Sequence, residues 1–150
     1  MFEFYDPGVL VDDDLELVLV ENYPGNPAIN YVPAYKFNMR QVGTSNVVGT
    51  FELRIGNTGH IIKYGGHIAY FVSPLHRGQR FAARALILLI PLARKHEMKR
   101  LWITCNPENT ASRRTCQIVG AKLIDVVELP EDTDMYREGE RRKCRYRLDL

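Results

Sequence analysis

Hydrophobic and polar positions alternate along much of the first half of the chain. A β-branched, partly alternating run at residues 15–21 predicts the first strand. Alternation at residues 35–42 and 47–55, on either side of a short polar turn, predicts a β-hairpin. Residues 22–33, between these strands, hold Pro24, Gly25, Pro27 and Pro33, and so many breakers predict a loop with no regular helix.

The apolar pattern changes period in the middle of the chain. Residues 67–72 are short, apolar and bounded by Gly-Gly and Ser-Pro, as is typical of a central strand buried on both faces. From Gly78 the apolar residues recur every three or four positions, which predicts an amphipathic helix ending near His96. Pro91 lies inside this pattern, so a kink or an early end is expected there.

The last third of the chain adds another helix and three strands. A strand at residues 100–105 precedes a helix at about 109–119, which Gly120 ends. Residues 122–129 and 141–150 predict two further strands, joined by an acidic, polar stretch. This order predicts a single α+β domain over residues 1–150, with one mixed, mostly antiparallel central sheet flanked by helices.

Composition and charge exclude several classes of protein. At 150 residues, with 45% hydrophobic and 25% charged residues, the chain can form a full core as one globular domain. A net charge of +2 gives no general field for nucleic acid, so an anion site has to be local. Residues 1–10 lack a cationic flank, and the longest apolar run, residues 86–93, is too short to span a bilayer. We therefore expect neither export nor membrane insertion.

The cysteines and histidines give no metal or disulfide pattern. The three cysteines are an odd number without C-x-x-C spacing, which is typical of a protein of the reducing cytoplasm: Cys105, Cys116 and Cys144. His60, His76 and His96 have no second ligand at metal spacing, so no metal is expected.

The turn between the apolar strand and the long helix is the strongest candidate binding site. A glycine-containing turn before a helix presents free backbone N–H groups at the positive end of the helix dipole, and these favour phosphate. Arg77, Arg80 and Arg84 gather there, although cations at a helix start cost about 0.3–1 kcal/mol each unless an anion offsets them. Either a bound pyrophosphate or nearby surface carboxylates could supply that negative charge.

Residues 72–82 resemble the acetyl-CoA motif of the GNAT acetyltransferases, Q/R-x-x-G-x-G/A, with Arg77 in the first position and Ala82 in the last. Downstream, residues 109–112 and the Gly-Ala pair at 120–121 resemble that family's second cofactor-side element. The resemblance covers about residues 47–150, and its first part is similar to a bacterial subgroup of predicted acetyltransferases. It implies the GNAT fold, acetyl-CoA as cosubstrate and transfer of an acetyl group to an amine.

The resemblance also implies which residues contact the cofactor. They lie on the apolar strand, in the turn and at the starts of the two helices: Tyr70, Phe71, Val72, Arg77, Gly78, Gln79, Arg80, Phe81, Ala82, Ala83, Asn109 and Ser112. Two positions depart from the family. Arg80 replaces a glycine that lets the backbone approach the pyrophosphate, so its side chain either helps to neutralise phosphate or weakens binding. Cys116 stands where many members carry the tyrosine that protonates the leaving thiolate.

The implied reaction is direct attack of an amine on the thioester. A lysine-like amine has a pKa near 10.4, so a base has to remove its proton. His67 is one candidate, because its unperturbed pKa is near 6.5, and Glu52 acting through a water is the other. Either side chain could instead be structural. Cys116 is a candidate acid or simply a buried apolar group, and a backbone N–H of the central strand, around Tyr70 to Val72, would stabilise the oxyanion.

The acceptor side is the least defined part of the sequence. In the family, two helices after the first strand wall the acceptor site, and residues 22–33 can hold neither. The site is therefore expected to be open to a small-molecule or peptide amine, or completed by a partner chain in a homodimer. Tyr23, Tyr31 and Tyr35 could line it or pack in the core.

Two other functions fit parts of the sequence. Arg80 and Cys116 at family positions also fit a CoA-binding module with little or no turnover. The arginine-rich stretch at residues 137–147 raises nucleic-acid binding, but carboxylates lie close by and strand alternation sends the side chains to both faces. Self-pairing is the expected outcome, with no nucleic-acid partner.

Overall fold

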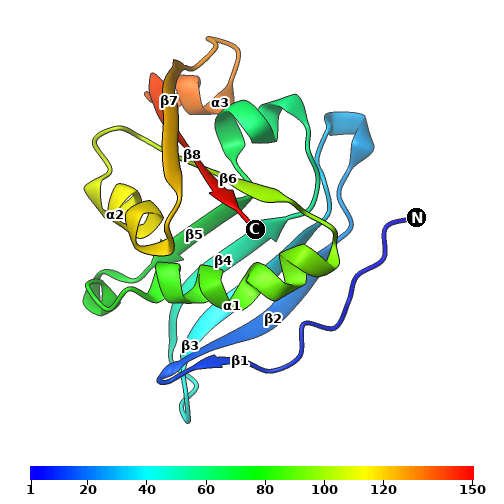
Figure 1. Cartoon of the computed structure of the whole chain (residues 1–150), viewed down its shortest axis with the longest axis vertical. Helices are drawn as coiled ribbons and strands as arrows, with labels where there is room; N and C mark the ends of the chain where they lie inside the picture. Colours follow the sequence, from blue (N-terminus) through cyan, green and yellow to red (C-terminus); the bar gives the residue numbers. More distant parts are fainter.

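All 150 residues are described by the computed structural model, in which the first five strands form one antiparallel sheet (Figure 1). These strands follow chain order across the sheet: β1 (Leu10–Asp12), β2 (Leu15–Tyr23), β3 (Ala34–Gln41), β4 (Val47–Arg54) and β5 (Ile68–Val72). The strands expected at residues 15–21, 35–42, 47–55 and 67–72 are therefore confirmed. Each pairs with its neighbour in the chain, so the sheet is a meander.

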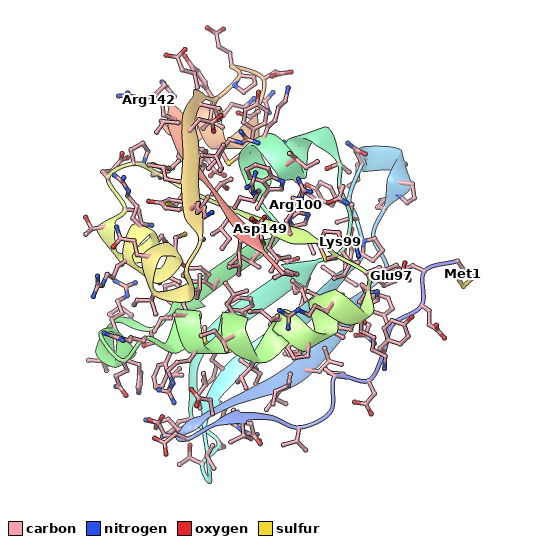
Figure 2. All side chains as sticks on the ribbon, in the orientation of Figure 1. Met1, Glu97, Lys99, Arg100, Arg142 and Asp149 are labelled. Atoms are coloured by element: carbon pink, nitrogen blue, oxygen red, sulfur yellow. The ribbon has the colours of Figure 1, made fainter.

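The last three strands form a separate antiparallel sheet in the order β6 (Arg100–Cys105), β8 (Arg142–Asp149), β7 (Lys122–Glu128). Arg100 and Asp149, labelled in Figure 2, lie opposite each other at one end of this sheet. The α+β class is as predicted, but the expected single sheet is in fact two. The hydrophobic pattern predicts each strand, but it does not show that β5 and β6 form no ladder with each other.

Helix α1 (Phe81–Lys95) covers one face of the larger sheet. Leu86 and Leu89 are fully buried against the strands' inward residues, which include Phe37, Phe51 and Leu53. The helix is continuous through Pro91, so of the two expected outcomes, a kink or an early end, the early end is wrong. The carbonyl that loses its partner belongs to Ile87, whose side chain is 51% exposed, so water can satisfy it on that side of the helix.

The opposite face of the larger sheet is polar and has no helix over it. Its side chains alternate with the buried ones and are half-exposed or exposed: Glu16, Lys36, Asn38, Arg40, Thr50, Glu52 and Arg54. An antiparallel sheet can face water on one side in this way. Residues 22–33 form only the 3-10 turn η1 (Pro27–Ile29), as the breakers predicted.

Helix α2 (Thr110–Val119) packs beside α1 and has the predicted ends. The Asn109 side chain accepts a hydrogen bond from Ser112 N–H at 3.1 Å, and Gly120 closes the helix with φ +83°. The short helix α3 (Asp134–Arg137) and the π-helical turn η2 (Ile61–Gly65) were not predicted, because each is too short for a periodic pattern. No helix has the length and apolar character needed to cross a membrane.

Candidate functional site

Three cavities are linked by shared lining residues, and the middle one lies between β5 and β6. The turn cavity, about 580 Å³, is formed by β5, the turn at residues 76–80, the start of α1 and one face of α2. The central cavity, about 250 Å³, lies between β5 and β6 and shares Tyr70, Asn109 and Ser112 with the turn cavity. The outer cavity, about 750 Å³, shares Arg54 and Met135 with the central one.

The outer cavity lies beside residues 22–33, the loop that stands where the resemblance implies two helices. Tyr23 and Tyr31 line it, together with Lys36, Glu52 and residues 132–135. Tyr35 does not line it, because that side chain is fully buried and its hydroxyl is hydrogen-bonded to His96 Nε2 at 2.7 Å. Of the three tyrosines proposed for an acceptor site, two therefore line a cavity and the third belongs to the core.

The turn before α1 carries a run of free backbone donors. The N–H groups of residues 78–83 donate to no acceptor within the protein, and the first helical bond in this region is Arg84 N–H to Arg80 O at 2.9 Å. Helix α1 has neither a side-chain cap nor an acidic residue in its first turn. Gly78 adopts φ +87°, a conformation that favours glycine. These donors, at the positive end of a 15-residue helix, form a site for an anion.

Arg80 adopts the left-handed conformation, with φ +61°, directly before α1. This conformation explains why the related motif carries glycine at the same position, since a Cβ atom there strains the backbone. The Arg80 side chain nevertheless lines the turn cavity. Arg80 therefore strains the backbone, but it places a cation beside the free donors.

Replacing Arg80 by glycine is expected to raise the free energy of unfolding by about 1 kcal/mol, because the left-handed strain is relieved. Arg80→Ala removes the same charge but keeps the Cβ atom, so it should give no such gain. Urea denaturation of both variants makes the comparison. Equal stabilities of the glycine and alanine variants would contradict the strain argument.

The three arginines near this turn have different surroundings. Arg84 binds Asp12 and Asp14, with Nε–Oδ2 and Nη2–Oδ1 distances of 2.6 Å each, and its hydrogen bond lowers the pKa of Asp14. Surface carboxylates therefore offset the charge of Arg84. Arg77 donates from Nε to Val72 O at 3.0 Å and lies over the Phe71 ring, and its charge has no carboxylate partner. Arg77 and Arg80 remain as cations of the turn cavity.

Sequence reasoning missed residues on α2 and at the end of β6. Arg114, Thr115 and Ile118 line the turn cavity, and Arg114 adds a third cation to it. Their spacing of three, four and seven residues after Ala111, which also lines this cavity, could have identified them, because residues three and four apart share a face. Asn106 lines the central cavity, and its buried Oδ1 atom has no hydrogen-bond partner in the protein. A buried acceptor of this kind can accept a hydrogen bond from an ordered water or from a bound molecule.

His67 is buried and hydrogen-bonded through both ring nitrogens, as the structural alternative expects, and its surroundings give no support to it as a general base. It is fully buried and lines none of the three cavities. Its Nδ1 accepts from Trp102 N–H at 2.8 Å, so Nε2 carries the proton and donates to Gly56 O and Asn57 Oδ1 at 3.0 Å each. Burial lowers the pKa of His67 to about 4. The neutral ring joins β5 to β6 at the closed end of the opening.

Cys116 is likewise part of the core. It is fully buried, lines none of the three cavities, and burial raises the pKa of its thiol to about 12. The structure therefore agrees with a small apolar group and gives no support to Cys116 as an acid. Tyr70, by contrast, lines both the turn and central cavities and donates its hydroxyl proton to Ser112 Oγ at 3.0 Å.

Glu52 is the candidate base that reaches a cavity. Its side chain is 27% exposed, lines the outer cavity and contacts Arg54, with an Oε2–Nη2 distance of 3.3 Å. Arg54 is fixed in turn by donating to Gly65 O and Gly66 O at 3.1 Å each. In the β4–β5 register Glu52 lies opposite Ala69, which lines the central cavity.

The backbone of β5 supplies a donor to the same opening. Ser73 N–H bonds to Val48 O at 2.8 Å, and the register continues through Thr50 opposite Phe71. Bonded rungs alternate in an antiparallel ladder, so the N–H of Phe71 faces β4 and that of Tyr70 faces away from it, toward the opening.

A family model described as an acetyltransferase (GNAT) domain matches residues 19–122. The chain belongs to the GNAT acetyltransferase family. The resemblance found in the sequence is confirmed. No curated protein matches the chain in a sequence comparison.

Solved GNAT acetyltransferases share this fold at low sequence identity. The microcin C7 self-immunity acetyltransferase MccE, in complex with acetyl-CoA and AMP, is 16% identical, with a TM-score of 0.61 over 78% of this chain and 61% of that one. A GNAT acetyltransferase from Bacillus anthracis is 18% identical, with a TM-score of 0.60 over 76% of this chain and 65% of that one. The chain thus spans less than two thirds of either protein.

A relative of matching length also has this fold. A putative ribosomal-protein-serine acetyltransferase from Vibrio cholerae is 17% identical, with a TM-score of 0.67 over 97% of this chain and 100% of that one. The GNAT fold therefore extends over nearly the whole chain, including the segments outside residues 19–122.

Proposed function

We propose that this GNAT protein transfers an acetyl group from acetyl-CoA to an amine by direct attack. The observation that carries the proposal is the series of three joined cavities, with free backbone donors and arginines at one end and a wide polar opening at the other. Acetyl-CoA enters through the turn cavity, the amine enters through the outer cavity, and the two meet in the central cavity.

The turn cavity suits the pyrophosphate of acetyl-CoA. The free N–H groups of residues 78–83 lie in the turn before α1 and in its first turn, and Arg77, Arg80 and Arg114 line the same cavity. Backbone donors and a helix dipole bind phosphate oxygens, and the arginines neutralise their charge. The pantetheine chain then extends along β5 into the central cavity, where Asn106 Oδ1 can accept from one of its amides.

In the central cavity the amine nitrogen attacks the thioester carbonyl. The oxyanion that forms lies near the Tyr70 N–H, which faces the opening, and a preorganised donor of this kind stabilises the transition state by about 3–4 kcal/mol. The C–S bond then breaks, and its electron pair goes to the sulfur of CoA.

Glu52 is the proposed base for the incoming ammonium. It lies one strand from the central cavity, opposite Ala69, so a water relays the proton from the amine to the carboxylate. His67 has no free lone pair for this step. Arg54 holds the Glu52 carboxylate in place at the border between the central and outer cavities.

The acceptor is proposed to be a small-molecule or peptide amine. The outer cavity is broad and carries carboxylates, cations and tyrosines together, with no helix over the adjoining sheet face. A peptide is supported by the breadth of the cavity and by the relative named as a putative ribosomal-protein-serine acetyltransferase. Nucleic acid is not favoured, since Arg137, Arg145 and Arg147 each pair with an aspartate of the chain.

Replacing Glu52 by glutamine is expected to lower kcat about 100-fold or more, because an amide cannot take the proton. Thiol release from acetyl-CoA over a panel of small amines and peptides gives the rate, and calorimetry gives the affinity for CoA. Glu16→Gln is the matched control, since Glu16 lies on the same polar face and pairs with Arg40 at 2.6 Å. It should leave both quantities unchanged.

Thiol release and calorimetry with CoA also distinguish an enzyme from a CoA-binding module. Thiol release by the unaltered protein with at least one acceptor supports the proposed function. Tight binding of CoA without release on any acceptor would leave a CoA-binding module instead.

A further inference from the structure

We propose that Tyr70 is the catalytic acid of this enzyme, which donates its phenolic proton to the sulfur of CoA as the thiolate leaves. This inference rests on the proposed function. Ser112 is the positioning residue that holds the Tyr70 hydroxyl in place.

Tyr70 occupies the border that the thioester has to reach. It lines the turn cavity, where the cofactor enters, and the central cavity, where the amine arrives. Asn109 and Ser112 share this border, but neither carries a proton that it can give up at neutral pH. Tyr70 is therefore the titratable side chain common to both cavities.

Other titratable groups of the central cavity are less suited to the step. Arg54, Tyr64 and Cys105 do not line the turn cavity, and Cys105 is almost fully buried. Glu140 and Lys143 hold each other at 2.9 Å and lie away from the turn cavity. Cys116, one helical turn after Ser112, lines neither cavity.

The Tyr70 side chain is held at both ends. Its ring stacks on the fully buried Phe51 with a centroid distance of 5.8 Å and an interplanar angle of 14°. Its hydroxyl donates to Ser112 Oγ at 3.0 Å, and Asn109 fixes the backbone of Ser112 at the start of α2. A group locked in this way needs little reorganisation when charge develops nearby.

The surroundings keep Tyr70 protonated until the thiolate forms. Burial raises the pKa of Tyr70, against the opposing hydrogen bonds of Ser112 and Thr115. The ionisable groups that face it are the thiols of Cys105 on β6 and Cys116 on α2, whose own pKa values are raised to about 11 and about 12. Both thiols are neutral at pH 7, so neither of them places a negative charge beside the phenol before the thiolate forms.

The proton transfer balances without a further reactant. When the C–S bond breaks, the phenolic O–H of Tyr70 turns from Ser112 Oγ to the sulfur and its proton forms the S–H bond of CoA. The Ser112 hydroxyl then donates to the phenolate oxygen. The proton that the amine released to the base returns through solvent to Tyr70 before the next turnover.

Tyr70→Phe keeps the ring and removes only the hydroxyl. Its kcat is expected to fall about 100-fold or more, with the KM for acetyl-CoA within about twofold of the unaltered protein. Tyr146→Phe is the matched control, because Tyr146 is also buried and its hydroxyl accepts from Arg113 on α2 at 3.1 Å. That variant should lose some stability and keep its kcat. A Tyr70→Phe kcat within threefold of the unaltered protein would overturn the proposal.

A second readout needs no acceptor. The ultraviolet absorbance of the thiolate gives the pKa of the CoA thiol while CoA is bound. A hydrogen bond from Tyr70 stabilises the thiolate, so Tyr70→Phe should raise that pKa by about one unit or more. Ser112→Ala should raise it by less, and Ser112→Thr should restore it. An identical thiol pKa in Tyr70→Phe and the unaltered protein would overturn the role of Tyr70 even where no acceptor is found.

The two readouts also separate this inference from the function on which it rests. CoA binding with no thiol release by the unaltered protein counts against acetyl transfer. A loss of thiol release that is seen only in Tyr70→Phe supports Tyr70 as the catalytic acid.

Discussion

Arg77→Glu is expected to lower the affinity for CoA at least about 100-fold at low ionic strength. Two unit charges about 5 Å apart interact by about 3 kcal/mol at an effective dielectric constant near 20, and charge reversal turns this attraction into a repulsion of similar size. Arg77 is exposed and lacks a carboxylate partner, so salt will weaken the effect but not remove it. Calorimetry at two salt concentrations measures the loss of CoA affinity and its dependence on salt.

Arg94→Glu is the control for this change. Arg94 lies on the same helix, at its far end, and the substitution alters the net charge by the same amount. It should change CoA affinity by less than about threefold, while Arg114→Glu should behave like Arg77→Glu, since Arg114 lines the turn cavity. Equal losses for Arg77→Glu and Arg94→Glu would mean that the pyrophosphate binds elsewhere.

The free energy of unfolding is expected to fall in acid because of His67. The pKa of His67 is about 4 in the folded protein, against 6.5 for an unperturbed histidine. The unfolded chain therefore binds the proton first as the pH falls, and the free energy of unfolding drops between pH 6.5 and pH 4 by about 3 kcal/mol. Above pH 6.5 both states are neutral and this contribution is fully present.

Urea denaturation at pH 7, 6, 5 and 4 measures this loss, with His67→Asn as the comparison. The variant is less stable throughout, but most of its pH dependence in this window should disappear. His96 contributes in the same direction, because burial lowers its pKa as well, so the difference between the two proteins isolates His67. Parallel pH curves for the two proteins would contradict the assignment of a buried neutral ring.

Local patterns along the chain were enough to predict most elements and the free backbone donors of the turn before α1. The period of α1, the Asn109 and Gly120 ends of α2 and the breakers in residues 22–33 depend on neighbouring residues alone, and the structure confirms each. Free donors in residues 78–83 follow from a strand–turn–helix order for the same reason.

What could not be predicted depends on contacts between distant segments. His67 meets Trp102, and Arg84 meets Asp12, and no local pattern gives these partners. The direction of His67 decides whether its nitrogens face a cavity or a strand, so a suitable pKa in isolation was misleading. The split between β5 and β6 is also a tertiary feature, and it creates the central cavity.

Arg80 and Cys116 have different physical explanations as departures from the family. Arg80 keeps the left-handed conformation that glycine adopts without strain, and it adds a cation beside the free donors. Cys116 lies in the core, and Tyr70, the proposed acid on β5, is hydrogen-bonded to Ser112 on α2.

A crystal structure with bound CoA would show directly where the cofactor lies. We expect pyrophosphate oxygens within hydrogen-bond distance of the N–H groups of residues 78–83, and the CoA sulfur beside the Tyr70 hydroxyl in the central cavity. CoA bound on the polar face of the larger sheet, with those N–H groups still free, would contradict this expectation.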